Sequence, residues 1–453
     1  MNLRNERGNV LVTVAIAIFV IIAFASIAID VGIMQSEHAR MQRACDAAAL
    51  AGAKKLPFEN VAKTNALYLA ERNGYEDGVD NVNISCIRNP DGNHSSHYQV
   101  VIEKDVQLYF AGIPFNADFA HIVTSATASY VSPLPMYISG SLDEYGVNGI
   151  QNLSCFGPYG RFSYGDAYST MYLNDGSDNP YYNDSGYNFL VEIGSDYFAK
   201  NGTNDIVFQI FDPDTWNEGN AQNSGPGRVD EIRSGTNNPG SNYTTTRFQL
   251  FSPDSTPGDF GDDNLIAEAE WGPSDNWSDM QWVTPGGWEF NLAEHGYGKY
   301  RINVETIGGS SENGFNLRAG SPDAVYGDNW DPNNGTEITA VGTLPINFNQ
   351  DGIVNVDLGY IPAEAGGSTI YVNKFDTDVG AKSITYYDDY GNSWPGELAG
   401  NGTFRIDDIQ IPQGYGGGRL YAEYEAGRQD TSSWQLYFDG QLSDVPGELR
   451  LVD

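Results

Sequence analysis

Acidic turns are the clearest candidates for chemistry in this sequence. Residues 211–218 read FDPDTWNE, residues 375–378 read FDTD, and residues 259–264 read DFGDDN. Calcium takes about six to eight oxygen ligands from carboxylates, amides and backbone carbonyls, and turns of this kind supply them. The residues predicted as calcium ligands are Asp212, Asp214, Asn217, Glu218, Asp376 and Asp378. No segment matches the twelve-residue calcium loop, and Asp and Asn also favour turns by bonding their own backbone, so solvated turns are the alternative.

Tryptophan is concentrated in the segment 271–288, which holds four of the eight tryptophans in the chain. Flat indole rings beside amide and carboxylate groups are a common way of holding a sugar. We predict Trp277, Trp282 and Trp288 as ligand-binding residues, with a glycan as a candidate ligand. The alternative is that these rings lie in a β-sandwich core, because burying such a ring contributes about 3–5 kcal/mol.

The sequence offers little for catalysis. It contains no H-E-x-x-H, G-x-S-x-G or P-loop motif, and His94 and His97 have no third histidine nearby to complete a metal site. We therefore predict that the protein is not an enzyme.

Negative charge is distributed very unevenly along the chain. The net charge is −36, yet residues 1–72 hold 8 Lys/Arg and only 6 Asp/Glu. The long remainder is strongly acidic and repels phosphate backbones, which excludes nucleic acid as a partner. Its 28 Tyr and 8 Trp argue against disorder, so the acidic part is expected to be folded.

Near the amino terminus lies an apolar run of twenty residues, Val10 to Ile29. At about 1.5 Å per helical residue it spans about 30 Å, the thickness of the hydrocarbon of a bilayer. Arg4 and Arg7 precede it, which favours a cytoplasmic amino terminus and an acidic remainder outside the cell membrane. The AFA sequence at 23–25 fits a signal-peptidase site, so a cleaved leader is the alternative to a retained anchor.

The next hundred residues predict a small α+β domain. Met34, Met41, Cys45, Ala48 and Gly52 form a helical stripe of small or adaptable side chains that can approach another element closely. A second helix, 59–75, and three alternating segments, 81–87, 98–110 and 121–131, follow it.

These elements resemble, in their order, the amino-terminal region of TadE/TadG-like Flp pilus-assembly proteins of bacteria. The apolar span ends in DVG at 30–32 and continues into DAAALAG at 46–52, and the segment 106–131 is similar to the short strand region of that family. The resemblance covers about residues 4–133 and implies a single-pass protein of the bacterial cytoplasmic membrane. Its implied partners are other pilus-assembly or envelope proteins.

Two features depart from related families. Processed pilins carry Glu five residues after the cleaved Gly, whereas Thr13 follows Gly8 at that spacing, which argues against prepilin-type cleavage. Many TadG-like proteins carry a D-x-S-x-S metal site, and this chain contains no such motif.

From about residue 160 the chain consists of short alternating segments separated by Gly, Asn, Asp and Pro, which is typical of antiparallel sandwiches. The order of segments in 187–320 recurs in 352–440, with Phe211-Asp212 corresponding to Phe375-Asp376, which predicts a duplicated unit; chance agreement of similar strand patterns is the alternative. The pattern distantly resembles pre-peptidase-type and other jelly-roll domains of exported bacterial proteins, which implies binding modules.

The predicted fold is therefore mainly β, with a transmembrane helix, a pilin-like α+β domain and two tandem jelly-roll-like sandwiches. The predicted domains are 1–32, the amino terminus and membrane helix; 33–133, the TadE/TadG-like stalk; and 134–330 and 331–453, the two sandwiches. We expect a membrane-anchored protein of a Tad/Flp-type pilus-assembly or surface-adhesion system, whose acidic head binds a cation, a glycan or a protein. The alternatives are a secreted carbohydrate-active enzyme or accessory module and a structural envelope spacer.

Overall fold

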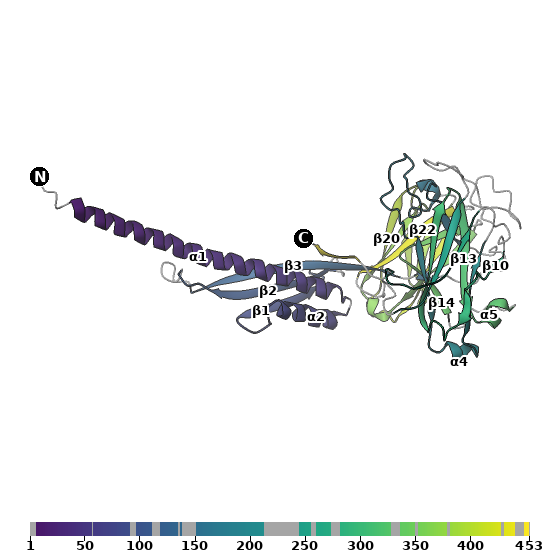
Figure 1. The fold of residues 1–453 in the computed structure, drawn as a ribbon, viewed down its shortest axis with the longest axis horizontal. Coiled ribbons are helices and arrows are strands. Elements are labelled where there is room, and N and C mark those ends of the chain that lie inside the picture. Colours follow the sequence, from purple (N-terminus) through teal and green to yellow (C-terminus); the bar gives the residue numbers. More distant parts are fainter. Residues whose placement is uncertain are drawn as a thin grey trace. The chain divides into compact units, whose positions relative to one another are not determined.

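The chain folds into two compact units, Met1–Val131 together with a carboxyl-terminal strand, and Ser132–Phe438, here called the β unit. The computed structural model describes residues 6–452 except for 57, 91–96, 111–117, 135, 138–150, 213–243, 255–259, 273–280, 328–335, 349–351, 378–380, 427–429 and 440–447. The fold is mainly β with a long apolar helix at the amino end (Figure 1), as predicted.

The unit that contains Met1–Val131 is here called the N-terminal unit, and it consists of two helices on a small antiparallel sheet. Its elements are α1 (Glu6–Ala53), α2 (Glu59–Arg72), β1 (Val82–Arg88), β2 (His97–Gln107), β3 (Phe119–Leu134) and β23 (Glu448–Val452). The strand order in this unit is β1-β2-β3-β23. The predicted second sandwich, 331–453, included the residues of β23, but this strand pairs with β3. In sequence, the β unit is thus inserted between two neighbouring strands of this sheet.

The first half of α1 has no protein partner in the described structure. The apolar side chains from Val10 to Phe24 lie exposed, and α1 runs well past the sheet (Figure 1). By length and composition α1 is able to cross a membrane, and its most apolar window has no share buried within the protein. Such a surface is stable in lipid and costly in water.

The second half of α1 packs closely on the sheet through small side chains, as the helical stripe predicts. Met41, Cys45 and Ala48 are fully buried. A Cβ at Gly52 would lie 2.2 Å from Cε1 of Tyr98, whose ring is buried on β2, so only glycine permits this approach. Three alanines of α2, Ala62, Ala66 and Ala70, complete the core of the unit.

Asp30 ties the end of the apolar segment to the loop that follows β2. Its side chain is buried, and its two oxygens accept hydrogen bonds from the backbone N–H groups of Tyr109 and Phe110 at 3.0 and 2.9 Å. The aspartate of the DVG element is therefore a structural link between the helix and the sheet.

Replacing Asp30 by alanine is expected to lower the free energy of unfolding of the N-terminal unit by about 1–3 kcal/mol. Two backbone N–H groups lose a charged acceptor, although water can hydrate part of this exposed loop. Thermal unfolding in detergent measures the change. Asp30→Asn keeps an acceptor and should lower the free energy of unfolding by less. Asp46→Ala, on the same helix, should change it little. Equal stability of Asp30→Ala and wild type would refute this role.

The β unit is built on one long antiparallel sheet covered by two smaller ones. In order, the long sheet contains β20 (Phe404–Gln410), β17 (Thr369–Phe375), β22 (Asp430–Asp439), β15 (Leu344–Phe348), β5 (Gln151–Phe156), β13 (Glu312–Gly320) and β7 (Asp205–Phe211), and both β10 (Trp282–Val283) and β11 (Glu289–Asn291) pair with β7. The first covering sheet contains β4 (Met136–Tyr137), β14 (Thr336–Val341), β6 (Tyr187–Ile193), β12 (Gly298–Gly308), β8 (Thr245–Phe251) and β9 (Leu265–Trp271). The second contains β16 (Gly352–Ile361), β21 (Gly418–Ala426), β18 (Ser383–Asp388) and β19 (Ser393–Gly396). Short helical turns are η1 (Phe162–Tyr164), α4 (Tyr197–Asn201), α5 (Pro322–Tyr326) and η2 (Ala363–Ala365).

Aromatic contacts show that the sheets face each other as sandwiches. Phe189 on β6 and Phe248 on β8 both contact Phe315 on β13, with ring centroids 5.8 and 5.7 Å apart. In the second half, Tyr424 on β21 contacts Trp434 on β22 at 5.8 Å. The buried apolar side chains of both halves form one continuous cluster.

Strand order repeats between the two halves, although β20, in the segment 401–411 that the sequence repeat matches to 264–272, pairs with β17 in the long sheet and is not equivalent to β9. The order β6-β12-β8-β9 corresponds to β16-β21-β18-β19, and the pair β13-β7 corresponds to β22-β17. The boundary predicted at 330/331 does not separate two closed domains, however. The strands β14 and β15 lie beyond it, yet they pair with β6 and β5 of the first half. Pairing β5 with β15 joins two sheet edges that would otherwise be exposed.

Candidate functional site

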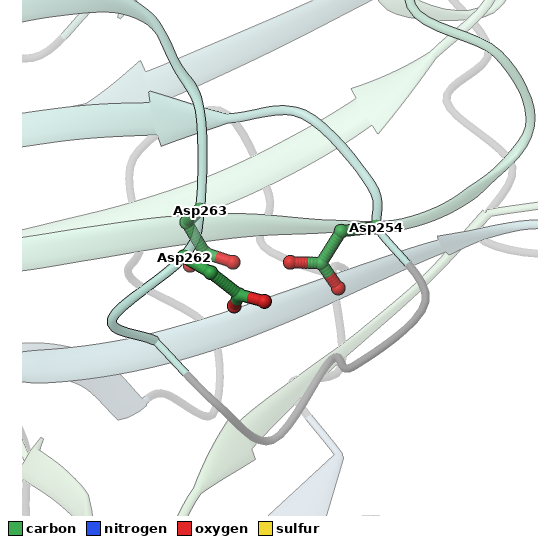
Figure 2. A group of neighbouring side chains, drawn as sticks. All are labelled: Asp254, Asp262 and Asp263. Carbon is green, nitrogen blue, oxygen red and sulfur yellow. The ribbon is translucent and has the colours of Figure 1, made fainter.

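Three carboxylates converge at the loop end of the β8–β9 hairpin. Asp254, Asp262 and Asp263 each offer an oxygen, and these oxygens lie within 4.8 Å of one another. Figure 2 shows Asp254 facing the other two across the hairpin. Among the residues that the structure describes, these three acidic side chains form the one group of three or more that lies close enough to share an ion.

The backbone of the hairpin brings these side chains together. Asp254 follows β8, and Asp262 and Asp263 precede β9, which pairs antiparallel with β8. A hydrogen bond of 2.9 Å from the N–H of Ser252 to the carbonyl of Asn264 holds the two strand ends together. The geometry of the group is therefore set by the sheet.

Arg301 on β12 neutralises part of this charge. Its guanidinium pairs with Asp263, donates to Asn188 at 2.8 Å and lies over the rings of Phe251 and Phe260 at 3.8 and 4.8 Å. Burial raises the pKa of Asp263 and the neighbouring Asp254 raises it further, while Arg301 acts in the opposite direction. Burial and the neighbouring Asp254 thus disfavour the charged form of Asp263, and an added cation would favour it.

The arrangement suits a hard divalent cation. Calcium binds oxygen at about 2.3–2.6 Å, so two oxygens on one ion lie up to about 5 Å apart, a separation that matches this group. Three monodentate carboxylates leave room for backbone or water oxygens to complete the coordination.

The calcium ligands predicted from the sequence do not form this group. Asp212 lies buried just after β7, and Asp376 is buried with φ +54°, where its carboxylate accepts a hydrogen bond of 2.9 Å from the N–H of Gly402. Asp376 therefore stabilises a turn. The other four predicted ligands, Asp214, Asn217, Glu218 and Asp378, lie outside the described residues.

The predicted glycan-binding tryptophans have different positions. Trp288 is fully buried in the core, so it has no face to offer a ligand, which corrects the prediction for this residue. Trp282 on β10 is half-buried, packs on Phe211 at 5.2 Å, and has the Arg318 guanidinium 4.2 Å over its ring. Trp277 lies outside the described residues.

Sequence reasoning identified the turn containing Asp262 and Asp263 but missed Asp254. Asp254 belongs to the segment SPDS at 252–255, which looks like an ordinary turn. The available signal was the alternation of β8 and β9 on either side, since a hairpin brings the residues flanking its strands together.

A comparison with family models matches residues 8–55 to the family described as "Putative Flp pilus-assembly TadE/G-like". Residues 8–55 are a TadE/G-like segment. The match contains the apolar half of α1, Asp30 and the alanine-rich stripe, so it confirms the resemblance over these residues. The matched residues and the helix that is long and apolar enough to cross a membrane overlap in the same part of the chain.

Solved structures give only distant likenesses. The tandem CBM22-1–CBM22-2 domains of Paenibacillus barcinonensis Xyn10C are 9% identical with a TM-score of 0.15, over 81% of this chain and 92% of that one. A Bacillus thuringiensis Cry1Da tryptic core variant is 12% identical with a TM-score of 0.14, over 57% of this chain and 51% of that one. A comparison with curated protein sequences finds no match.

Proposed function

We propose that this TadE/G-like protein is a single-span component of a Tad/Flp-type pilus-assembly or surface-adhesion system. In this proposal α1 anchors the chain in the bacterial cytoplasmic membrane, and the β unit is an extracytoplasmic head that binds without catalysing a reaction. The observation that carries it is the continuity of α1, which passes from an exposed apolar half directly into the packed core of the N-terminal unit.

Membrane fractionation and protease treatment of spheroplasts test this placement. The intact chain is expected in the inner-membrane fraction, and added protease is expected to degrade the β unit without lysis. Recovery of a shortened chain from the medium would instead favour a secreted protein with a cleaved leader. Protection of the β unit until lysis would contradict the proposed orientation.

The second part of the proposal concerns the acidic group. We propose that Asp254, Asp262 and Asp263 bind calcium, because they are the three described carboxylates that one ion can bridge. The β-unit surface is acidic, so binding one divalent cation there also lowers its self-repulsion. Protein partners of the Tad system are the second class of ligand for the head, whereas the buried Trp288 gives a glycan little support.

Calcium is expected to raise the melting temperature of the β unit in the full chain. At a free concentration of about one hundred times Kd the stabilisation is about 2.7 kcal/mol. The shift should shrink as pH falls, because the raised pKa of Asp263 lets protons compete with the ion at a higher pH than for an ordinary aspartate.

Asp262→Asn should remove most of this calcium-induced shift. Asp175→Asn is the matched control, since Asp175 lies in an exposed turn where its carboxylate accepts hydrogen bonds from Ser177. Identical melting curves of the wild type with calcium and with a chelator would favour the structural-spacer alternative over a cation-binding head.

A further inference from the structure

Lys374 is a fully buried lysine in the second sandwich. It lies on β17, an inner strand with β20 on one side and β22 on the other, and its side chain is 0% exposed. Its Nζ forms an ion pair with Asp407 on β20. Val372 lies directly opposite Asp407 in the register, so the lysine approaches the carboxylate diagonally across two adjacent strands.

Asp407 is held in place from the facing sheet. The hydroxyl of Tyr386 on β18 donates to its Oδ2 at 2.7 Å, and the backbone N–H of Glu397 lies 3.2 Å from each oxygen. A Cβ at Gly396 would lie 2.9 Å from Oδ2, so the glycine permits this close approach of the backbone. These groups fix the carboxylate and polarise it toward the lysine.

The lysine is poorly satisfied as an ammonium ion. An ammonium carries three donors, whereas Nζ of Lys374 makes one hydrogen bond within the described part of the chain, to Asp407, and lies 5.7 Å from the centre of the Tyr386 ring. Burial lowers the pKa of Lys374, and Asp407 acts against this shift. Keeping two charges in a core costs desolvation that an ion pair repays only with full hydrogen bonding.

We propose that Lys374 and Asp407 join covalently, forming an intramolecular isopeptide bond between Nζ and Cγ. The N–C bond would link β17 to β20 inside the sandwich and remove both charges from the core. This inference is independent of the calcium site and of the membrane placement.

The reaction balances without any co-reactant. A proton passes from Nζ to the Asp407 carboxylate, which leaves a neutral amine beside a carboxylic acid. The amine lone pair attacks Cγ, a second proton moves from nitrogen to the departing oxygen, and the C–O bond breaks. One water leaves, with its oxygen from Asp407 and both hydrogens from Lys374.

The neighbouring groups have defined roles in this step. The Tyr386 hydroxyl and the Glu397 N–H stabilise the negative charge that develops on the carboxyl oxygens during attack. The two strands hold the reacting groups together, which replaces a bimolecular encounter by an intramolecular one. The reaction occurs once per chain and requires only folding.

Peptide mapping of the wild-type protein tests the proposal directly. The full chain is purified from membranes, denatured, digested with trypsin and analysed by mass spectrometry. The expected product is a branched peptide containing Lys374 and Asp407, lighter by one water than its two parts, with no cleavage after Lys374. Lys382, in the exposed pair with Glu425, should be cleaved and serves as the internal control. Separate linear peptides, with cleavage after Lys374, would overturn the proposal.

Variants identify the reacting atoms. Lys374→Met should abolish the branched peptide, and Asp407→Asn should form it with loss of ammonia in place of water. Tyr386→Phe should slow its accumulation after synthesis, whereas Lys382→Met should leave it unchanged. A water loss that persists in Lys374→Met, or that maps to another pair, would overturn the assignment even if a variant folds poorly.

Discussion

Replacing Glu312 by alanine is expected to destabilise the whole β unit by about 3–5 kcal/mol. Glu312 is fully buried at the start of β13. Its Oε1 accepts hydrogen bonds from the hydroxyl of Ser154, from the amide of Asn347 at 3.0 Å and from the hydroxyl of Thr431 at 2.8 Å. Each buried donor left without this acceptor costs about 1–3 kcal/mol, and the lost side chain also leaves a cavity.

Glu312 lies where the two halves of the β unit meet, so its substitution also tests whether the β unit unfolds cooperatively. Its partners lie on β5, β15 and β22, so the network crosses the line where the two halves of the long sheet meet. With one core and one shared sheet, the β unit should unfold in a single transition. Two independent domains would instead show two transitions, only one of them shifted by the substitution.

Urea unfolding of the full chain, followed by tryptophan fluorescence, measures both quantities. Glu312→Gln keeps the side-chain shape and one acceptor, so it should lower the free energy of unfolding by less than Glu312→Ala. Glu305→Ala is the matched control, because Glu305 forms a half-exposed pair with Arg247 that contributes about 0–1 kcal/mol. A loss below about 1 kcal/mol in Glu312→Ala would contradict the role of the buried network.

Local features of the fold could be predicted because they depend on periodicity and composition. The apolar run of α1, the stripe containing Met41, Cys45 and Ala48, and the alternation of the strands all follow from side-chain spacing along one element. The duplication was visible for the same reason, since Phe211-Asp212 and Phe375-Asp376 end equivalent strands, β7 and β17.

Long-range pairings could not be predicted from such patterns. The pairing of β5 with β15 and of β23 with β3 joins segments far apart in sequence, and strand alternation does not specify a partner. The candidate site was only half predicted for a related reason. In a chain with 60 acidic residues, composition does not distinguish Asp254, which the hairpin brings to Asp262, from Asp212, which the core buries.

Replacing Arg301 by methionine is expected to lower the stability of the β unit by about 3–5 kcal/mol in the presence of a chelator. The side chains of Arg301 and Asp263 are only 8% and 6% exposed, and breaking a buried pair leaves the remaining charge without compensation. The variant also loses the contacts of the guanidinium with the rings of Phe251 and Phe260.

Calcium should recover part of this loss, and this recovery connects Arg301 to the proposed cation site. In the wild type, Arg301 and a bound ion compete for the charge of Asp263, so removing the arginine should enlarge the calcium-induced rise in melting temperature. Thermal unfolding of the full chain with calcium and with a chelator measures both effects. Arg247→Met is the matched control, because the half-exposed pair of Arg247 with Glu305 lies on the same sheet; its stability should change by less than about 1 kcal/mol and its calcium response should not change. If Arg301→Met is destabilised yet calcium restores nothing, the three aspartates do not bind the ion, and Arg301 serves only to hold the hairpin on β12.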